Sequence, residues 1–372
     1  MTRNNLTLFL LILLLTLGSC RNSKSSLERD DAREGVVEAK LLSITHNKGY
    51  TKVEIINPWD TTKLLQTYLL VPRDSELPKD LPKGTVVRTP IQNVLVYSSV
   101  HSSLMHELGC FDVVKGVTDA QYFNDTDITS GISSGEITDC GSSMAPTIER
   151  VIEMEADAVW LSPYQDATYG QVAKLGVPII ECADYLETTP LGRAEWVRFY
   201  GELLGCPDKA DSLYNAVRET YTSLKEQISS DRTFSRPKVL TEMVISGVWN
   251  VPGGHSYMAR LIADAGGDYP WADNESTGSL SLDFNQVLAI AQDADVWLVK
   301  SFMVHSLKDL EGVFKLNTSF KAFGNRQVYV CDTNSSHLFD RFPFHPNVLL
   351  REYHNIFTGR DNELVFFERL EK

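Results

Sequence analysis

Histidine and cysteine side chains often bind metal ions directly, and their spacing in this sequence argues against such a site. His101 and His106 are five residues apart, which places them on different faces of a helix. His337 and His345 are separated by a segment that contains proline. No HExxH motif and no CxxC pair occurs. The sequence therefore favours no metal site made by the protein's own side chains.

Two common motifs of nucleotide-dependent enzymes are missing as well. The chain has no P-loop and no dinucleotide-binding fingerprint. Its glycine-rich stretch, VPGGHSYMARLIADAGG, is typical of a turn followed by a helix that ends at Gly266 and Gly267. We therefore expect a protein that is not an enzyme and that needs no cofactor.

The order of strand-like and helix-like segments predicts an α/β fold. From Val94, short β-branched runs alternate with helical segments: NVLVYSS then VHSSLMHELG, and TIERVIEM then DAVWLS. After RPKVLTEMV the alternation resumes through DVWLVKS and QVYVCD to a closing helix around NVLLREYHNIF. Strands that alternate with helices favour parallel sheets covered on both faces. We predict two Rossmann-like lobes with mainly parallel sheets.

Two other segments complete the predicted organisation. YTKVEIINPWD and LLQTYLLVP alternate apolar and polar residues and predict an antiparallel β-hairpin, with a turn at Pro58 and Trp59. DKADSLYNAVRETYTSLKEQI has apolar residues three and four apart, which predicts a long helix with one buried stripe. The expected domains are a first lobe with the hairpin over residues 40–189, a helical spine over 190–232 and a second lobe over 233–372.

The beginning of the chain has the pattern of a lipoprotein signal. Arg3 precedes an unbroken apolar run from Leu8 to Leu15, which is too short for a permanent transmembrane helix. The following LGSC resembles a bacterial lipobox, in which Cys20 receives the lipid. An ordinary cleaved signal with a chance cysteine is the alternative. We predict a signal peptide over residues 1–19 and a lipidated, disordered tether over residues 20–39.

The net charge of the chain excludes two classes of partner. The formal net charge is −14. Nucleic acids and anionic lipid surfaces would be repelled by such a chain. We expect no nucleic-acid partner, and contact with a membrane only through the lipid anchor.

The cysteines after Cys20 do not predict a disulfide framework. Their number is odd and none has CxxC spacing, so at most two bridges could form and the pairing stays open. They are Cys110, Cys140, Cys182, Cys206 and Cys331.

Two segments of the chain are similar to each other: APTIERVIEMEADAVWLSP and LDFNQVLAIAQDADVWLVK. An alignment of Asp157 with Asp293 also places Val151 on Val287. Each lobe therefore has a helix that enters an apolar strand in the same way, as expected for two lobes that share a fold.

Several motifs in order resemble the periplasmic binding proteins of ABC importers for ferric siderophores, haem and vitamin B12. They are the lipoprotein signal, ELGCFDVVKGVTD, GSSMAPTIERVIEMEADAVWLSP, the helical spine, VPGGHSYMARLIADAGG and LSLDFNQVLAIAQDADVWL, and the similarity covers roughly residues 93–356. The resemblance implies two lobes joined by a long rigid helix, with a ligand cleft between the lobes. It also implies a monomer anchored by lipid in a bacterial cell envelope, on the periplasmic side.

The same resemblance implies a ligand and a membrane partner. The ligand would be an iron chelate, either a ferric siderophore or haem, and the partner would be the transmembrane subunits of an importer. A corrinoid ligand is the alternative. A protein that binds a bare metal ion, or an envelope lipoprotein without a role in transport, is less favoured.

The resemblance also gives a role to a glutamate at the start of a helix in each lobe, which forms a salt bridge with arginines of the permease. Glu149 occupies this position in the first lobe, whereas the aligned residue of the second lobe is Asn285. Asp283 lies nearby and could supply the second charge. The alternative for Glu149 is a favourable charge at a helix start, worth about 0.3–1 kcal/mol.

Binding proteins of this type place their ligand contacts on loops at the carboxyl ends of strands. Aromatic residues and a few polar residues at such positions suit a large planar or chelated ligand. We expect Trp160 and Trp297, which lie within strands, to belong to the core instead. The predicted ligand contacts are Tyr97, Ser98, His101, Tyr122, Phe123, Tyr164, Trp249, His255, Lys300, Phe302, Asp340 and Arg341.

Overall fold

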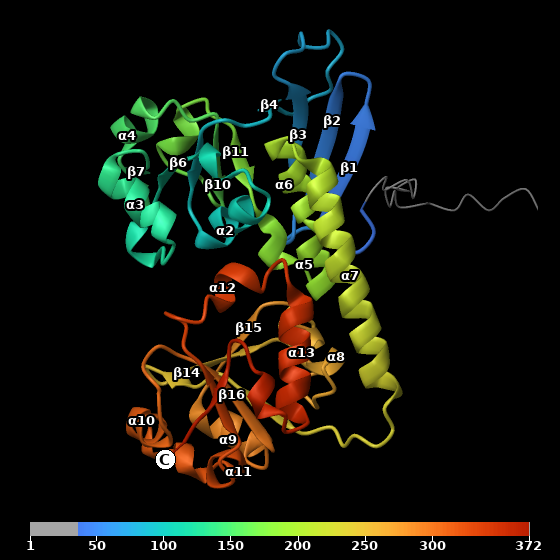
Figure 1. The fold of residues 1–372 in the computed structure, drawn as a ribbon, viewed down its shortest axis with the longest axis vertical. Helices are drawn as coiled ribbons and strands as arrows, with labels where there is room; N and C mark the ends of the chain where they lie inside the picture. The colour runs from blue at the N-terminus through green and yellow to red at the C-terminus, as the bar shows by residue number, and fades with distance from the viewer. Residues whose placement is uncertain (1–35, 372) are drawn as a thin grey trace, which may run out of the picture. The chain divides into compact units, whose positions relative to one another are not determined.

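The structure is a computed structural model that describes residues 36–371 (Figure 1). The predicted signal peptide and Cys20 lie outside the described residues. Within the described part, no helix has the length and apolar character needed to cross a membrane.

The first lobe contains the predicted parallel sheet. Its strand order is β11-β10-β5-β6-β7, and all four neighbouring pairs are parallel. Every residue of β5 and β10 is apolar and buried, as expected for a sheet covered on both faces. The strands are β5 (Val94–Val96), β6 (Val114–Val117), β7 (Thr138–Asp139), β10 (Ala158–Leu161) and β11 (Ile179–Glu181). The helices are α2 (Ser99–Glu107), α3 (Thr126–Ser134) and α4 (Ile148–Glu153), and a short hairpin of β8 (Gly141–Ser142) and β9 (Ala145–Pro146) precedes α4.

The second lobe has one mainly parallel sheet and one antiparallel sheet. The first has the order β12-β16-β17-β18, in which only the last pair is antiparallel. Its strands are β12 (Val239–Thr241), β16 (Val296–Lys300), β17 (Val328–Cys331) and β18 (Glu368–Arg369). The antiparallel sheet, which the sequence analysis did not predict, consists of β13 (Val244–Ile245), β14 (Val248–Pro252) and β15 (Ser279–Leu282). The helices are α8 (Tyr257–Asp264), α9 (Phe284–Ala291), α10 (Leu307–Val313), α11 (Lys321–Gly324), α12 (Leu338–Arg341) and α13 (Pro346–Phe357).

The predicted hairpin is part of a larger sheet that precedes the first lobe in the chain. It has the order β1-β2-β3-β4, with β1 (Leu42–Asn47), β2 (Tyr50–Ile56), β3 (Leu64–Pro72) and β4 (Thr85–Thr89). The antiparallel pairing of β2 with β3 confirms the hairpin, and β4 adds to β3 in parallel. We call these four strands the N-terminal sheet.

The helical spine is also confirmed, as three consecutive helices. They are α5 (Pro190–Glu195), α6 (Val197–Leu204) and α7 (Pro207–Ser230). Gly205 ends α6 in a left-handed conformation (φ 73°), and Pro207 then begins α7. The stripe of α7 is buried at Val217 and Tyr221 as predicted. Figure 1 shows α7 continuing from α6 to α8 and α13 of the second lobe, and α7 contacts all three helices.

The structure corrects the alignment of the two helix–strand segments. The helices begin in the predicted register, because Thr147 and Asp283 are their N-caps. The aspartate equivalent to Asp157 is, however, Asp295 and not Asp293. Asp157 and Asp295 each accept a hydrogen bond from the backbone just before the neighbouring strand, from Asn93 at 3.2 Å and Lys238 at 2.9 Å. The second lobe therefore has two more residues between helix start and strand than the first.

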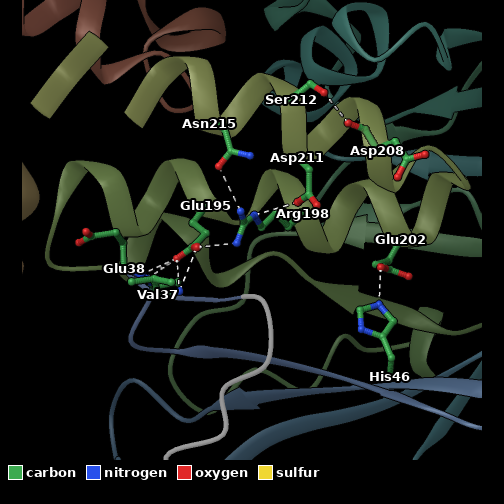
Figure 2. Close-up of polar contacts among 11 residues, drawn as sticks. Val37, Glu38, His46, Glu195, Arg198, Glu202, Asp208, Asp211, Ser212 and Asn215 are labelled. Atoms are coloured by element: carbon green, nitrogen blue, oxygen red, sulfur yellow. Dashed lines mark hydrogen bonds and ion pairs between the residues drawn. The ribbon is translucent and has the colours of Figure 1, made fainter. Parts of the chain in front are cut away.

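The N-terminal end of the described chain is fixed to the spine by one buried carboxylate (Figure 2). The side chain of Glu195 is fully buried and accepts hydrogen bonds from the backbone N–H groups of Val37, Glu38 and Ala39 at 2.6–3.0 Å. Arg198 Nη1 donates to the same carboxylate at 3.1 Å. Residues 36–39, which the sequence analysis assigned to the tether, therefore belong to the folded domain.

The structure also brings two of the cysteines together. The sulfurs of Cys110 and Cys206 are 3.5 Å apart, which joins the loop after α2 to the start of α7. Burial and the neighbouring Cys110 raise the pKa of Cys206 to about 12. Both cysteines are free thiols in the structure, as are Cys140, Cys182 and Cys331.

Candidate ligand-binding site

Three cavities open near the carboxyl ends of the parallel strands. Their volumes are about 700, 630 and 490 Å³. These sizes are typical of small-molecule sites. We name them, in that order, the interlobe, second-lobe and first-lobe cavities, and the last two names give the lobe that contributes most of the lining residues.

The second-lobe cavity combines one ion pair with an aromatic wall. Glu242 follows β12 and Lys300 ends β16, and the Lys300 ammonium donates a hydrogen bond to the Glu242 carboxylate. Most of the remaining wall is aromatic or apolar, and part of it comes from the first half of the chain. These residues include Trp59, Tyr185 and Leu186 from the first half and Tyr257, Met258, Phe339 and Phe342 from the second lobe. Such a wall suits a large ligand with flat faces.

The first-lobe cavity is lined by tyrosines and by the β8–β9 hairpin. Tyr97 follows β5 and Tyr164 follows β10, and the ring of Tyr164 lies 6.4 Å from that of Tyr169. Met144, at the tip of the hairpin, is 83% exposed. Burial, with Cys140 and Asp119 nearby, raises the pKa of Tyr97 to about 12. The Tyr97 hydroxyl therefore stays protonated at neutral pH and can donate a hydrogen bond.

The interlobe cavity is polar and lies where the two lobes touch. Its walls include His106, Glu107 and Asp125 from the first lobe and His337, Asp340, Arg341 and His345 from the second lobe. Ser99 Oγ donates to the Asp340 carboxylate, and the imidazole Nε2 of His345 lies 2.7 Å from the carboxylate of Glu107. Asn124 Nδ2 donates to the carbonyl of Asn334 at 2.8 Å. Polar contacts therefore hold the two lobes together on this side.

A buried polar network connects the lobes on the side of the spine. The Asp184 carboxylate accepts hydrogen bonds from Tyr200 Oη at 2.8 Å and Arg193 Nε at 3.0 Å. Arg193 Nη1 donates to the hydroxyl of Tyr257 in the second lobe at 2.8 Å. Burial by itself would raise the pKa of Asp184, but the hydrogen bond from His101 and the charge of Arg193 lower it below its ordinary value. The carboxylate is therefore charged at neutral pH and can hold both partners.

His101 belongs to this network and not to a cavity wall, which corrects the sequence prediction. It is 2% exposed, and its Nε2 lies 3.3 Å from Asp184 Oδ1. Burial works to lower the pKa of His101, but the neighbouring Cys182 and Asp184 raise it to about 10. His101 is the third residue of α2, and the inward face of this helix packs on Trp160.

Trp249 and Phe123 are further corrections, because both are core residues. Trp249 is fully buried, its ring stacks on Trp297 with centroids 5.7 Å apart, and its Nε1 donates to the carbonyl of Thr241 at 2.9 Å. Phe123 is 4% exposed. Trp160 and Trp297 are fully buried, which confirms the prediction that they belong to the core.

The other predicted contacts divide between cavity walls and open surface. The predicted residues that line cavities are Tyr97 and Tyr164 in the first lobe, Lys300 in the second lobe, and Asp340 and Arg341 between the lobes. Three exposed residues line none of the three cavities: Tyr122, His255 and Phe302. Ser98 is the N-cap of α2 and accepts a hydrogen bond from Val100 N. Among the described residues, Asp340 pairs with Ser99 and His337, not with Arg341.

Several aromatic cavity residues were missed by the sequence analysis. Tyr185 follows β11, so the expectation that ligand contacts lie on loops at the carboxyl ends of strands applies to it as well. Tyr257 begins α8, in a stretch that was interpreted only as a turn and a helix. No local signal identifies Trp59, because its turn joins two strands of another sheet.

His106 also has acidic neighbours that the sequence did not reveal. Its Nε2 lies 3.0 Å from Asp125 and 3.4 Å from Asp127. A histidine and two carboxylates are a ligand set that divalent metal ions accept. His106 pairs with each of the two carboxylates, and Asp125 caps the N-terminus of α3. Their arrangement is therefore explained without a metal ion.

One string of the sequence matches a hydrolase motif. Residues 131–135 read GISSG, which fits the GxSxG pattern of serine hydrolases. In those enzymes the serine lies on a sharp turn between a strand and a helix. Ser133 instead lies within α3, where its Oγ donates to the carbonyl of Thr129 at 2.8 Å. The context of a hydrolase nucleophile is therefore missing at this serine.

The residues predicted to meet a permease have equivalent positions in the two lobes. Glu149 and Asn285 are each the second residue of their helix, α4 and α9, and both are exposed. Asp283 is exposed too, but its carboxylate accepts a hydrogen bond from Gln286 N at 3.0 Å in a capping box. Among the described residues, the Glu149 carboxylate of the first lobe has no hydrogen-bond or ion-pair partner, whereas the Asp283 carboxylate of the second lobe caps its own helix.

Comparison with known sequences identifies one family. The profile described as periplasmic binding protein matches residues 94–334. An uncharacterized lipoprotein of Methanocaldococcus jannaschii is 27% identical over 274 residues, which cover 66% of this chain and 64% of that protein.

Comparison with solved structures gives the same fold at low identity. A periplasmic heme binding protein from Pseudomonas aeruginosa aligns with a TM-score of 0.59 and 14% identity, over 76% of this chain and 99% of that chain. An ABC-type Fe³⁺-hydroxamate transport protein from Saccharomonospora viridis aligns with a TM-score of 0.54 and 18% identity, over 72% of this chain and 93% of that chain. The vitamin B12 binding protein of Vibrio cholerae aligns with a TM-score of 0.54 and 12% identity, over 73% of this chain and 98% of that chain. The α/β fold with a long helix is thus that of two-lobed binding proteins.

Proposed function

Because this chain belongs to the periplasmic binding protein family, we propose that it is the substrate-binding component of an ABC importer. It captures an iron chelate, a ferric siderophore or haem, and delivers it to the transmembrane subunits. Its site binds a solute and performs no reaction. The lipid at Cys20 anchors it in the cell envelope, and the relative named as a lipoprotein supports this anchor.

The observation that carries this proposal is the aromatic lining of cavities at the strand ends of both lobes. Tyr97 and Tyr164 line one cavity, and Tyr257 and Phe339 line the other. Large chelates offer flat or apolar faces that such side chains contact. The haem and Fe³⁺-hydroxamate proteins of the same fold support this ligand class. A corrinoid is the second candidate, because the vitamin B12 binding protein also shares the fold.

The test is intact-complex mass spectrometry of the protein in a mixture of ferric siderophores, haem and cobalamin. We expect one adduct, with the mass of an iron chelate. Metal-free siderophores and protoporphyrin serve as the control, and they should compete poorly. A cobalamin adduct would select the second candidate. A protein that binds no member of the mixture would contradict a role in chelate import.

Glu149 provides a test of delivery that is separate from capture. Its exposed position on α4, outside the three cavities, predicts that Glu149→Lys leaves the ligand Kd unchanged. Uptake through the cognate importer should fall by roughly tenfold or more, because a lysine would face permease arginines, and a like-charge contact costs several kcal/mol.

Glu153→Lys is the matched control, since it makes the same charge change on an exposed residue at the other end of α4. Uptake is measured in cells that lack the native binding protein. Equal uptake by the two variants would return Glu149 to the role of a favourable charge at a helix start.

A further inference from the structure

The N-terminal sheet lies before the part of the chain that matches the family, yet it contributes to the second-lobe cavity. The family profile begins at residue 94, whereas the sheet ends at Thr89. Trp59, in the turn between β2 and β3, lines the cavity together with Tyr257 and Phe339 of the second lobe. An element outside the residues that match the family therefore provides part of the aromatic wall of this cavity.

The turn that carries Trp59 is held by its own hydrogen bonds. Asn57 Oδ1 accepts from the backbone N–H of Trp59 at 2.9 Å and of Asp60 at 3.1 Å. Asn57 N also donates to the carbonyl of Lys63 at 2.9 Å, which closes the turn at its base. Trp59 is thus presented on a short, ordered turn and not on a long loop.

The sheet itself is fixed to the first lobe. The hydroxyl of Tyr68 donates to the carbonyl of Ile179 and accepts from Glu181 N, both at 2.8 Å. Arg73 Nη2 donates to Asp157 at 2.7 Å. Trp59 therefore keeps its position relative to the first lobe, whereas Tyr257 and Phe339, which line the same cavity, belong to the second lobe.

We propose that Trp59 is a ligand-contacting residue, and that its indole stacks on a flat conjugated face of the bound chelate. A porphyrin and the aryl groups of a catecholate siderophore share such a face, whereas an aliphatic hydroxamate siderophore has none. Stacking on an indole favours the first two ligands. This inference rests on the proposed function and narrows its ligand class.

The first experiment compares Trp59→Ala with the wild-type protein in calorimetric titrations. The probes are haemin, an iron(III) tris-catecholate and an iron(III) tris-hydroxamate. We expect Trp59→Ala to weaken binding of haemin or the catecholate roughly 10- to 100-fold, as for other buried aromatic anchors. Trp59→Phe should recover most of this loss, and Trp59→Leu, which keeps apolar volume without a ring, should not. Leu77→Ala is the matched control, since Leu77 is an exposed apolar residue in the β3–β4 loop and lines none of the three cavities.

A second readout uses the exposure of the six tryptophans. Five are buried and Trp59 is half-buried. Acrylamide should therefore quench mainly Trp59, and bound ligand should protect it. In Trp59→Phe the ligand should leave acrylamide quenching unchanged.

The outcomes separate this inference from the proposed function. If the wild-type protein binds haemin or the catecholate and Trp59→Ala binds it equally well, the inference is wrong and the proposed function stands. Binding of the hydroxamate alone would also contradict the inference and leave the proposed function intact. A wild-type protein that binds no probe and no cobalamin contradicts the proposed function, and the inference falls with it.

Discussion

Replacement of Trp249 by alanine is expected to destabilise the protein by about 3–5 kcal/mol, as measured for other large core truncations. The indole is fully buried and packs against both Trp297 and Phe320, with ring centroids 5.7 and 5.5 Å away. Its removal leaves a cavity and also leaves the carbonyl of Thr241 without the indole hydrogen bond. Denaturant unfolding followed by circular dichroism measures the change.

The control for this prediction is Phe302→Ala. Phe302 was predicted as a ligand contact by the same reasoning, but it is 55% exposed. Its truncation should change the free energy of unfolding by no more than about 0.5 kcal/mol. If Trp249→Ala instead kept the stability of the wild-type protein and lost ligand binding, Trp249 would be a ligand contact and not a core residue.

Loss of the Glu195 carboxylate should have a comparable effect. In Glu195→Ala, the N–H groups of Val37, Glu38 and Ala39 lose their acceptor, and Arg198 loses a buried anion (Figure 2). Removal of one partner of a buried charge pair costs about 3–5 kcal/mol. We also expect residues 36–39 to become sensitive to protease, because their contacts with the spine are broken.

Glu202→Ala is the matched control, also visible in Figure 2. Glu202 pairs with His46 at 2.9 Å, but the side chain of His46 is 58% exposed. A surface pair of this kind contributes at most about 1 kcal/mol. Denaturant unfolding compares the two variants. If Glu195→Ala lowers the free energy of unfolding no more than Glu202→Ala does, the Glu195 carboxylate does not fix the N-terminal segment.

Local patterns of the sequence were enough to predict many elements of this fold, although not the β13–β14–β15 sheet. Alternating runs gave the β2–β3 hairpin, β-branched runs gave β5, β10 and β16, and the apolar stripe gave α7, because burial on one face or on both faces leaves a periodic pattern in the chain. The order of the motifs was enough to indicate the family, which the match over residues 94–334 shows. The cores around Trp160 and Trp297 followed from the strands that contain them.

The positions of side chains around the site were decided only by the tertiary structure. His101 and Tyr97 lie four residues apart after the same strand, yet one is in a buried network and the other lines a cavity, because α2 turns one of its faces to the core. Trp249 is buried because β14 packs against the main sheet of the second lobe, and Trp59 reaches a cavity because a separate sheet is fixed beside the first lobe. Each outcome depends on contacts between segments far apart in the chain, and no local periodicity encodes them.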